Sequence, residues 1–329
     1  MKASINNIIT IILIFLLPIS FLISLSIGPY SKVGFYQVIQ TILGIKLQST
    51  YRDILNYRLM RTLASLLLGI GLSSSGLTLQ YTLKNPLADP YLLGISSGAI
   101  FGVTLAEYFG YYSYYQLYFI SLIGALSSLG FILLISAIFR SSSTTIIIAG
   151  ISLSYLLSGL TTIYMIKLGP RIPSVLFWLF GSVSFTTLGT LEKSSILVLI
   201  SLVFMFYNWK AINTLMLGED ISRSLGVKVS YIRIISVVSA SLSTAALVAM
   251  AGPVGFIGLA APWMARLIVG SNFGKALIMS LLTGLLLAIF SDILARLVIY
   301  PSEAPLTAIT SIFGAPVLIY LALKYRGRL

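Results

Sequence analysis

Few side chains in this 329-residue sequence can do acid–base or nucleophilic chemistry, because the chain contains no histidine and no cysteine. Imidazole general bases, thiol nucleophiles, disulfides and His or Cys metal sites are therefore excluded. The sequence also lacks a GxxxxGK[ST] phosphate loop, so it does not hydrolyse ATP by that route. Asp89, Glu219 and Asp220 are expected in loops. This placement disfavours an intramembrane enzyme, although a serine–lysine or carboxylate mechanism stays open.

The arginines are the charged side chains with the most suggestive spacing. Arg58 and Arg61, in NYRLMRTLAS, lie one helical turn apart where an apolar stretch begins. Arg296, in SDILARLVIYPSE, ends another apolar stretch, and Asp292 lies one turn before it. Such arginines either extend along the membrane interface as anchors or form a cationic rim that binds an acidic partner. Spacing alone leaves both interpretations open.

The elements that position these residues are predicted from composition. Hydrophobic residues make up 58% of the chain, charged residues 9%, and the mean hydropathy is +1.02. A soluble domain carries about 25% charged residues, so lipid is the expected solvent, and apolar runs of ~20 residues can cross it as helices. We predict an all-α polytopic membrane protein that forms one domain over residues 1–329. The ten predicted spans are 7–28, 59–82, 91–108, 117–139, 144–166, 192–208, 232–251, 255–269, 276–299 and 306–323.

Basic residues at the two ends predict the orientation. An even number of spans puts both termini on one side, and the terminal basic residues place that side in the cytoplasm. These residues are Lys2, Lys324, Arg326 and Arg328. The first span has no signal-peptide cleavage motif, so we expect it to stay attached. The net charge of +13 is typical of cytoplasmic loops beside anionic lipid, and no soluble basic face predicts nucleic-acid binding.

Residues 208–233, NWKAINTLMLGEDISRSLGVKVSYIR, form the longest polar segment expected on the inside. Gly218 precedes Glu219 and Asp220, which suit the first turn of a short helix, and Gly226 suits its end. Apolar residues recur every fourth position in this helix: Leu217, Ile221 and Leu225. This apolar face packs either on the same chain or on a cytoplasmic partner.

The stretch NPLADPYLLGISSGAIFG, residues 85–102, breaks one helix and starts the next. Pro86 and Pro90 predict a tight turn that contains Asn85 and Asp89. Gly94, Gly98 and Gly102 then recur every fourth residue, a pattern that allows close helix packing in a membrane. Irregular backbone is not tolerated against lipid, so the turn lies in water or lines a cavity.

Five blocks of this sequence resemble, in order, the permease subunits of type II ATP-binding-cassette (ABC) importers, the FecCD-like family that carries ferric siderophores, haem or cobalamin. They are RLMRTLASLLLGIGLSSSGLTLQ, NPLADPYLLGISSGAIFG, LMLGEDISRSLGV, AGPVGFIGLAAPWMARLIVG and SDILARL followed by SEAPLTAITSIFGAPVLIYLAL. The resemblance covers nearly the whole chain. One departure is clear, because the family usually has histidine after the proline of the eighth helix and this chain has Trp263.

The resemblance implies ten helices per subunit, a homodimer with the path on its two-fold axis, two separate ATPase subunits inside and one substrate-binding protein outside. It assigns docking of the binding protein to Arg58, Arg61 and Arg296. It assigns the cytoplasmic gate to Asn85, Leu87, Ser143 and Thr144. It assigns coupling to the ATPase to Gly218, Glu219, Asp220, Arg223, Leu225 and Gly226. The chain itself would bind no cofactor and no metal, since the partner ATPase binds ATP and magnesium.

These implications favour a non-catalytic permease of a metal-chelate importer in the cell membrane, with a ferric siderophore as the first choice of cargo. Cobalamin and haem are the alternatives within the family. A secondary transporter that uses no ATP would need titratable or ion-liganding groups within the membrane or inverted repeats, and the sequence shows no convincing repeat. A structural subunit would leave the helix within 208–233 without an ATPase to bind.

Overall fold

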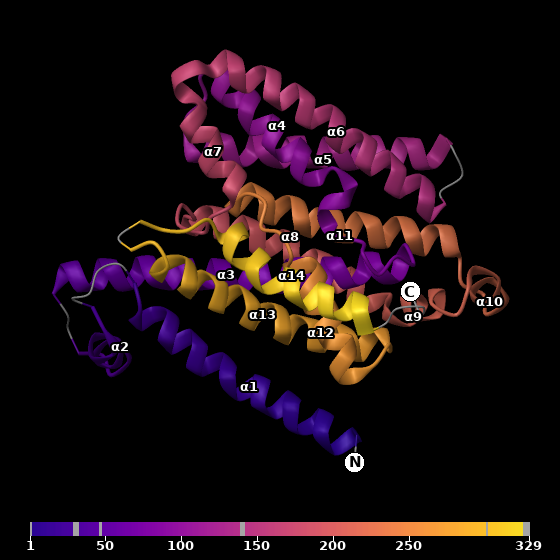
Figure 1. Ribbon diagram of the computed structural model, residues 1–329, viewed down its shortest axis with the longest axis horizontal. Helices are drawn as coiled ribbons and strands as arrows, with labels where there is room; N and C mark the ends of the chain where they lie inside the picture. The colour runs from indigo at the N-terminus through magenta and orange to yellow at the C-terminus, as the bar shows by residue number, and fades with distance from the viewer. Residues whose placement is uncertain (1, 29–32, 46–47, 139–141, 301, 325–329) are drawn as a thin grey trace.

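The computed structural model describes residues 2–28, 33–45, 48–138, 142–300 and 302–324, and the regular elements in these ranges are all helices (Figure 1). The α-helices are α1 (Lys2–Ser26), α2 (Phe35–Ile42), α3 (Ser49–Thr82), α4 (Ile95–Tyr108), α5 (Tyr114–Ile138), α6 (Ser143–Leu168), α7 (Ile172–Phe180), α8 (Leu188–Tyr207), α9 (Trp209–Leu215), α10 (Glu219–Ser224), α11 (Val229–Ala251), α12 (Ile257–Val269), α13 (Phe273–Leu297) and α14 (Leu306–Lys324). Two 3-10 helices are also present, η1 (Pro90–Leu93) and η2 (Gly169–Arg171).

The predicted all-helical membrane fold is confirmed, and each of the ten predicted spans overlaps a helix. Seven helices in the described residues are long and apolar enough to cross a membrane: α1, α3, α5, α6, α8, α11 and α13. The other three predicted spans correspond to η1 with α4, to α12 and to α14. A short apolar helix, α7, lies between η2 and α8.

Two features of the helices were not predicted. Helix α3 begins at Ser49 instead of residue 59, because its first turns carry Arg52 and Asp53 and are too polar to be recognised from hydropathy. Helix α2 precedes it and packs its buried Val38 against Leu55 of α3.

The centre of the bundle is α3, which packs closely against α13, α11 and α12. Small residues permit this approach. A Cβ added to Gly69 would lie 2.5 Å from the carbonyl oxygen of Gly284 on α13, and one added to Gly76 would lie 1.8 Å from that of Gly258 on α12. Because lipid supplies no hydrophobic drive between helices, such close contacts hold the bundle together.

The glycine series after the double-proline turn serves two purposes. Gly98 faces Gly124 of α5, since an added Cβ would lie 2.4 Å from the Gly124 carbonyl oxygen, and this confirms the predicted close packing. Gly94 instead ends η1 with a φ of 71°, a left-handed conformation that glycine adopts without strain.

Figure 1 shows α4, α5, α6 and α7 as a layer above a central group that contains α3, α8, α11 and α13. Helix α1 begins, and α14 ends, toward the end of the molecule that carries α9 and α10. We call this the inner end and the opposite one the outer end. The start of α1 and the end of α14 therefore lie toward the same end of the molecule, as predicted. Of the residues that predicted the orientation, Arg326 and Arg328 lie outside the described residues, as do the side chains of Lys2 and Lys324.

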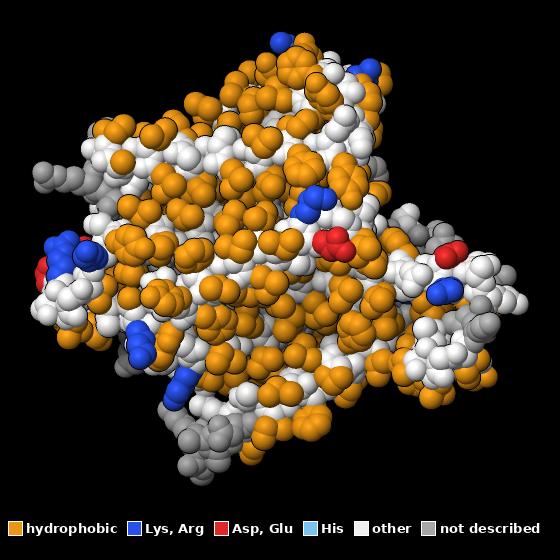
Figure 2. Space-filling view, turned by 180° about the vertical axis from the view of Figure 1, so that it is seen from behind, with side chains coloured by type: hydrophobic (Ala, Val, Ile, Leu, Met, Phe, Trp, Pro, Cys, Tyr) orange, Lys and Arg blue, Asp and Glu red, His pale blue; other side chains and the backbone are white. Residues whose placement is uncertain are grey.

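Hydrophobic side chains cover most of the face seen in Figure 2, and few charged side chains interrupt them. A water-soluble monomer rarely exposes a continuous apolar surface of this extent. The surface therefore matches the lipid solvent that the composition predicts.

Candidate functional site

The predicted turn between the second and third spans is present at the inner end and is fixed by its own side chains. The Asn85 carboxamide oxygen accepts a hydrogen bond from the Leu87 N–H at 2.9 Å. The Asp89 carboxylate accepts one from the Tyr91 N–H at 2.9 Å and so caps η1. Leu87 points outward, with 58% of its side chain exposed. This places Asn85 and Leu87, the first two predicted gate residues, on an ordered loop.

Burial within this loop raises the pKa of Asp89 to about 6, while the hydrogen bond from Tyr91 opposes the rise. The charged carboxylate is thus less stable here than in water.

Ser143 and Thr144, the other predicted gate residues, lie in the first turn of α6. Ser142 caps this helix by accepting a hydrogen bond from the Thr145 N–H at 3.0 Å. Ile146, one turn further, belongs to the same hydrophobic cluster as Leu83 and Ala88 of the turn. The fold therefore brings both predicted gate segments to the inner end, and their function as a gate stays a prediction.

A groove of about 520 Å³ runs between the η1–α4 segment and α6. Hydroxyl groups are its most frequent polar feature. Its lining consists of Asp89, Tyr91, Leu92, Ser96, Ser97, Ile151, Ser154, Tyr155 and Ser158. The groove could not be predicted from the sequence, because helical spacing alone does not distinguish a serine that packs from one that lines a path.

The predicted helix within 208–233 is α10, and its expected bounds are confirmed. Gly218 precedes it with a φ of 119°, and Gly226 follows it with a φ of 81°. Ser222 fastens the helix to α9, because its hydroxyl donates to the carbonyl oxygen of Thr214 at 2.8 Å.

The apolar face of α10 does not pack on the same chain. Leu217, Ile221 and Leu225 are 58%, 50% and 60% exposed. The interpretation in which this face is buried within the chain is therefore wrong, and the face remains available at the inner end.

Ion pairs tie α10 to the helix that follows. The carboxylate of Glu219 pairs with Arg233 of α11 through one oxygen and with Arg223 through the other, at 3.3 Å. Arg233 is buried, whereas Asp220 is almost fully exposed and lies 3.8 Å from Arg223. Glu219 is therefore the predicted coupling residue with the firmest structural role.

The three arginines predicted to form a docking rim lie inside the protein. Arg58, Arg61 and Arg296 are 2%, 3% and 1% exposed. The expectation that their guanidinium groups form an open cationic surface is wrong, because carboxylates and carbonyls of the same chain surround them. Asp292, one turn before Arg296, forms an ion pair with it.

Two carboxylates and the end of α1 hold these arginines at the outer end. Arg61 pairs with Asp292 at 2.7 Å and with Glu303 of the α13–α14 loop. Arg58 donates to the carbonyl oxygen of Leu25 at 2.9 Å, and Arg296 donates to that of Ser24 at 2.7 Å. The last carbonyls of a helix lack partners within it and attract cations. The arginines thus fix α1 to α3 and α13.

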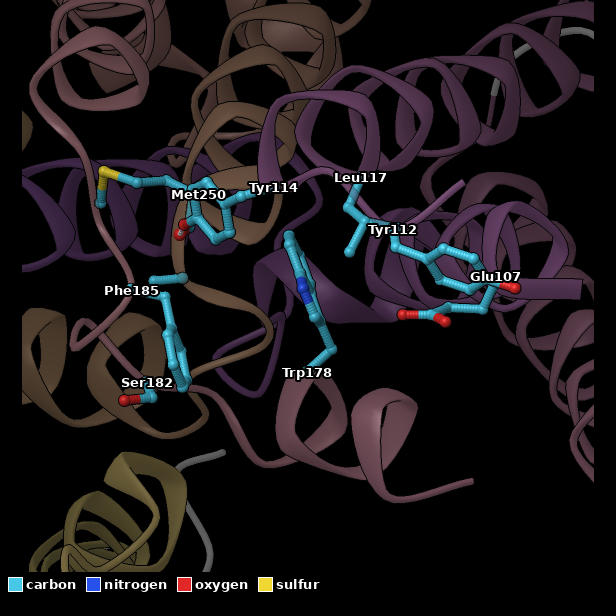
Figure 3. Close-up of a pocket in the computed structure, with 9 residues that line it drawn as sticks. Glu107, Tyr112, Tyr114, Leu117, Trp178, Ser182, Phe185 and Met250 are labelled. Atoms are coloured by element: carbon cyan, nitrogen blue, oxygen red, sulfur yellow. Dashed lines mark hydrogen bonds between the residues drawn. The ribbon is translucent and has the colours of Figure 1, made fainter. Parts of the chain in front are cut away.

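A second cavity, of about 260 Å³, lies at the outer end beneath α7 (Figure 3). Trp178 projects into it between Phe185 on one side and Tyr112 with Glu107 on the other. Met250 of α11 and Leu117 of α5 complete its walls. The short helix α7 therefore rests on an aromatic-lined space and not on a filled core.

Potential metal ligands do not cluster in the described part of the chain, where no group of three or more Asp or Glu side chains could hold an ion. The expectation that the chain binds no cofactor stays a prediction.

Comparisons with known proteins agree on one family. The model of the FecCD transport family matches residues 16–324. The chain is 36% identical over 324 residues to the ferric enterobactin transport system permease protein FepD of Escherichia coli, covering 96% of this chain and 95% of FepD. It is 33% identical over 321 residues to the molybdate import system permease protein MolB of Haemophilus influenzae, covering 94% of each chain.

A solved structure with the same fold is that of a metal-chelate type ABC transporter in an inward-facing conformation. The TM-score is 0.85 at 30% identity, and the match covers 97% of this chain and 99% of the other. The family resemblance drawn from the five sequence blocks is thus confirmed.

Proposed function

Because this chain belongs to the FecCD transport family, we propose that its cargo is an iron chelate, with a ferric siderophore as the first choice. The chain is a permease subunit of an ABC importer, and in such importers separate subunits hydrolyse ATP. FepD is named for ferric enterobactin and MolB for molybdate, so family membership alone does not specify the cargo. The greater likeness to FepD supports the iron chelate, and cobalamin and haem remain the alternatives within the family.

The observation that carries the proposed mechanism is the exposed apolar face of α10 at the inner end. Leu217, Ile221 and Leu225 would face water there, which is unfavourable without a partner. We propose that two copies of an ATPase subunit cover this face, one on each permease copy. Closure of the ATPases on ATP would then displace α10, and α10 would move α11 through the pair between Glu219 and Arg233.

The groove beside α6 supports a homodimer. Its serines and Asp89 open toward the same side as Tyr155, which is 77% exposed. Against lipid the Asp89 carboxylate would keep its hydrogen bond from the Tyr91 N–H but would lose water, at a cost of several kcal/mol if it is ionised. We propose that a second copy packs against α6 and α14, so that the two grooves form one water-filled path. Hydroxyl-rich walls give the cargo weak contacts and allow release.

The inner gate proposed for Asn85, Leu87, Ser143 and Thr144 closes this path toward the cytoplasm, where both termini would lie. At the outer end, we propose that a substrate-binding protein docks on the loops that the buried arginines hold in place, and not on the arginines themselves. Reversing the charge of Arg61 would then disrupt folding before it altered docking, because Asp292 and Glu303 would lose their partner.

The test is reconstitution in lipid vesicles with the genetically neighbouring ATPase and binding protein. Uptake of a radiolabelled ferric siderophore that depends on both partners and on ATP supports the proposal. Uptake of molybdate in its place would replace the proposed cargo. Uptake of either solute without the ATPase would overturn the importer mechanism and favour a secondary transporter.

A further inference from the structure

Helix α12 contains a proline that frees a backbone carbonyl for a neighbouring helix. Pro262 has no N–H, so the carbonyl of Gly258, one turn earlier, receives no helical hydrogen bond from it. The side-chain amide of Gln80, near the end of α3, lies 3.4 Å from this oxygen and donates to it. The proline thus creates a polar attachment point between α12 and α3.

Gln80 also contacts a second residue of α12, Arg266. Its carboxamide oxygen accepts a hydrogen bond from Arg266 at 2.7 Å. The Arg266 guanidinium in turn lies 4.2 Å from the ring centroid of Trp263, within the range of a cation–π interaction. Arg266 therefore fixes the plane of the Trp263 ring.

Trp263 then reaches the loop between α3 and η1. Its indole N–H donates to the carbonyl oxygen of Pro86 at 3.0 Å, across 177 positions of sequence. Pro86 lies between Asn85 and Leu87, the two loop residues that the proposed gate contains. The loop also includes Lys84, whose φ of 51° is unusual for a residue other than glycine.

A second attachment holds only the far side of this loop. The Tyr91 hydroxyl of η1 accepts a hydrogen bond from the N–H of Val254 at 2.8 Å and donates to the carbonyl oxygen of Val254 at 3.0 Å. Pro90 also packs against Gly258, since an added Cβ there would lie 2.7 Å from the proline ring. Without the Trp263 bond the loop would still be held at η1 and by the buried Leu83 and Ala88, and would be freer around Asn85 and Leu87.

We propose that Trp263 is a positioning residue for the inner gate: through the Pro86 carbonyl it holds the Asn85–Leu87 loop, and α12 with Arg266 and Gln80 holds Trp263. The inference rests on the proposed function, in which this loop closes the path. Trp263 stands where the family usually has histidine, and this proposal assigns a specific structural role to its side chain.

The first experiment measures the loop directly and does not depend on transport. Trp263→Phe keeps an aromatic ring beside Arg266 but removes the N–H donor together with part of the indole ring, so a control with the same change elsewhere is needed. Hydrogen–deuterium exchange of the peptide that covers residues 84–94 should quicken about fivefold, the effect of one lost hydrogen bond. Trp178→Phe makes the same chemical change in the outer cavity and should leave this peptide unchanged. Equal exchange in unaltered protein and Trp263→Phe would overturn the inference.

The second experiment measures whether the loop controls leakage through the proposed gate. Vesicles that contain the permease with its ATPase are loaded with radiolabelled sucrose, and efflux is measured without ATP. The Trp263→Phe variant should leak about fivefold faster than the Trp178→Phe variant, because the loop opens more often. Faster exchange without faster efflux would overturn the gating inference. The proposed function is decided separately, by ATP-dependent uptake of the ferric siderophore in the unaltered complex.

Discussion

Replacement of Glu219 by glutamine should uncouple ATP hydrolysis from transport. Glu219 begins α10, and its carboxylate pairs with Arg233 at the start of α11. Arg233 is 4% exposed, whereas Glu219 is 35% exposed. The substitution removes the negative charge, retains nearly the same volume and leaves a buried cation without its carboxylate.

The expected magnitude follows from the burial of the two partners. Loss of one member of a fully buried ion pair costs about 3–5 kcal/mol. Water reaches Glu219 and screens the interaction, so the cost here is about 2 kcal/mol. A difference of that size raises the population of displaced α10 about 30-fold. Ser222 still fastens α10 to α9, so the helix itself should persist.

The assay is the ratio of cargo imported to ATP hydrolysed in vesicles that contain permease, ATPase and binding protein. Glu219→Gln should lower this ratio while ATP hydrolysis continues. Asp220→Asn is the matched control, because it makes the same charge change at a neighbour that is 99% exposed and lies 3.8 Å from Arg223. The exchanged pair Glu219→Arg with Arg233→Glu should recover part of the ratio.

An unchanged ratio for Glu219→Gln would refute the reasoning, provided that the variant assembles with its ATPase. So would an equal loss in Asp220→Asn, because the effect would then reflect the net charge of α10 and not the specific pair with Arg233.

Three further predictions concern stability and are checked by thermal unfolding in detergent. Asp292→Asn should destabilise the fold by about 3–5 kcal/mol, because two buried arginines share this carboxylate. Glu303→Gln changes a side chain that is 27% exposed and should cost about 1 kcal/mol, so equal costs for the two variants would contradict the buried network. Asp89 has a raised pKa of about 6, so the folded state binds its proton more tightly than the unfolded state does, and stability should fall as pH rises from about 4 to 6. Asp89→Asn should remove this pH dependence of stability. A dependence that persists in the variant would belong to another group. Gly76→Ala would place a Cβ 1.8 Å from a backbone oxygen and should lower the free energy of unfolding by about 3 kcal/mol. Gly130→Ala, with open space around it, should be neutral or stabilising by up to about 1 kcal/mol. A tolerated Gly76→Ala would contradict the close contact of α3 with α12.

The sequence by itself determined the membrane class, the approximate positions of ten helices and the local breaks between them. These features depend on neighbouring residues: runs of apolar side chains need lipid, Pro86 and Pro90 interrupt a helix, and Gly218 and Gly226 bound α10. The five ordered blocks also identified the family, which the family model and the solved structure confirm.

Only the tertiary structure decided which polar side chains are buried and what they contact. Arg61 meets Asp292 across 231 positions and Arg296 meets Ser24 across 272, so the local pattern of arginines at helix ends could not reveal that they face inward. The same holds for Trp263, whose partner Pro86 belongs to another helix pair. The physical reason is that burial and hydrogen bonding depend on how helices pack, whereas hydropathy and helix breakers act along the chain.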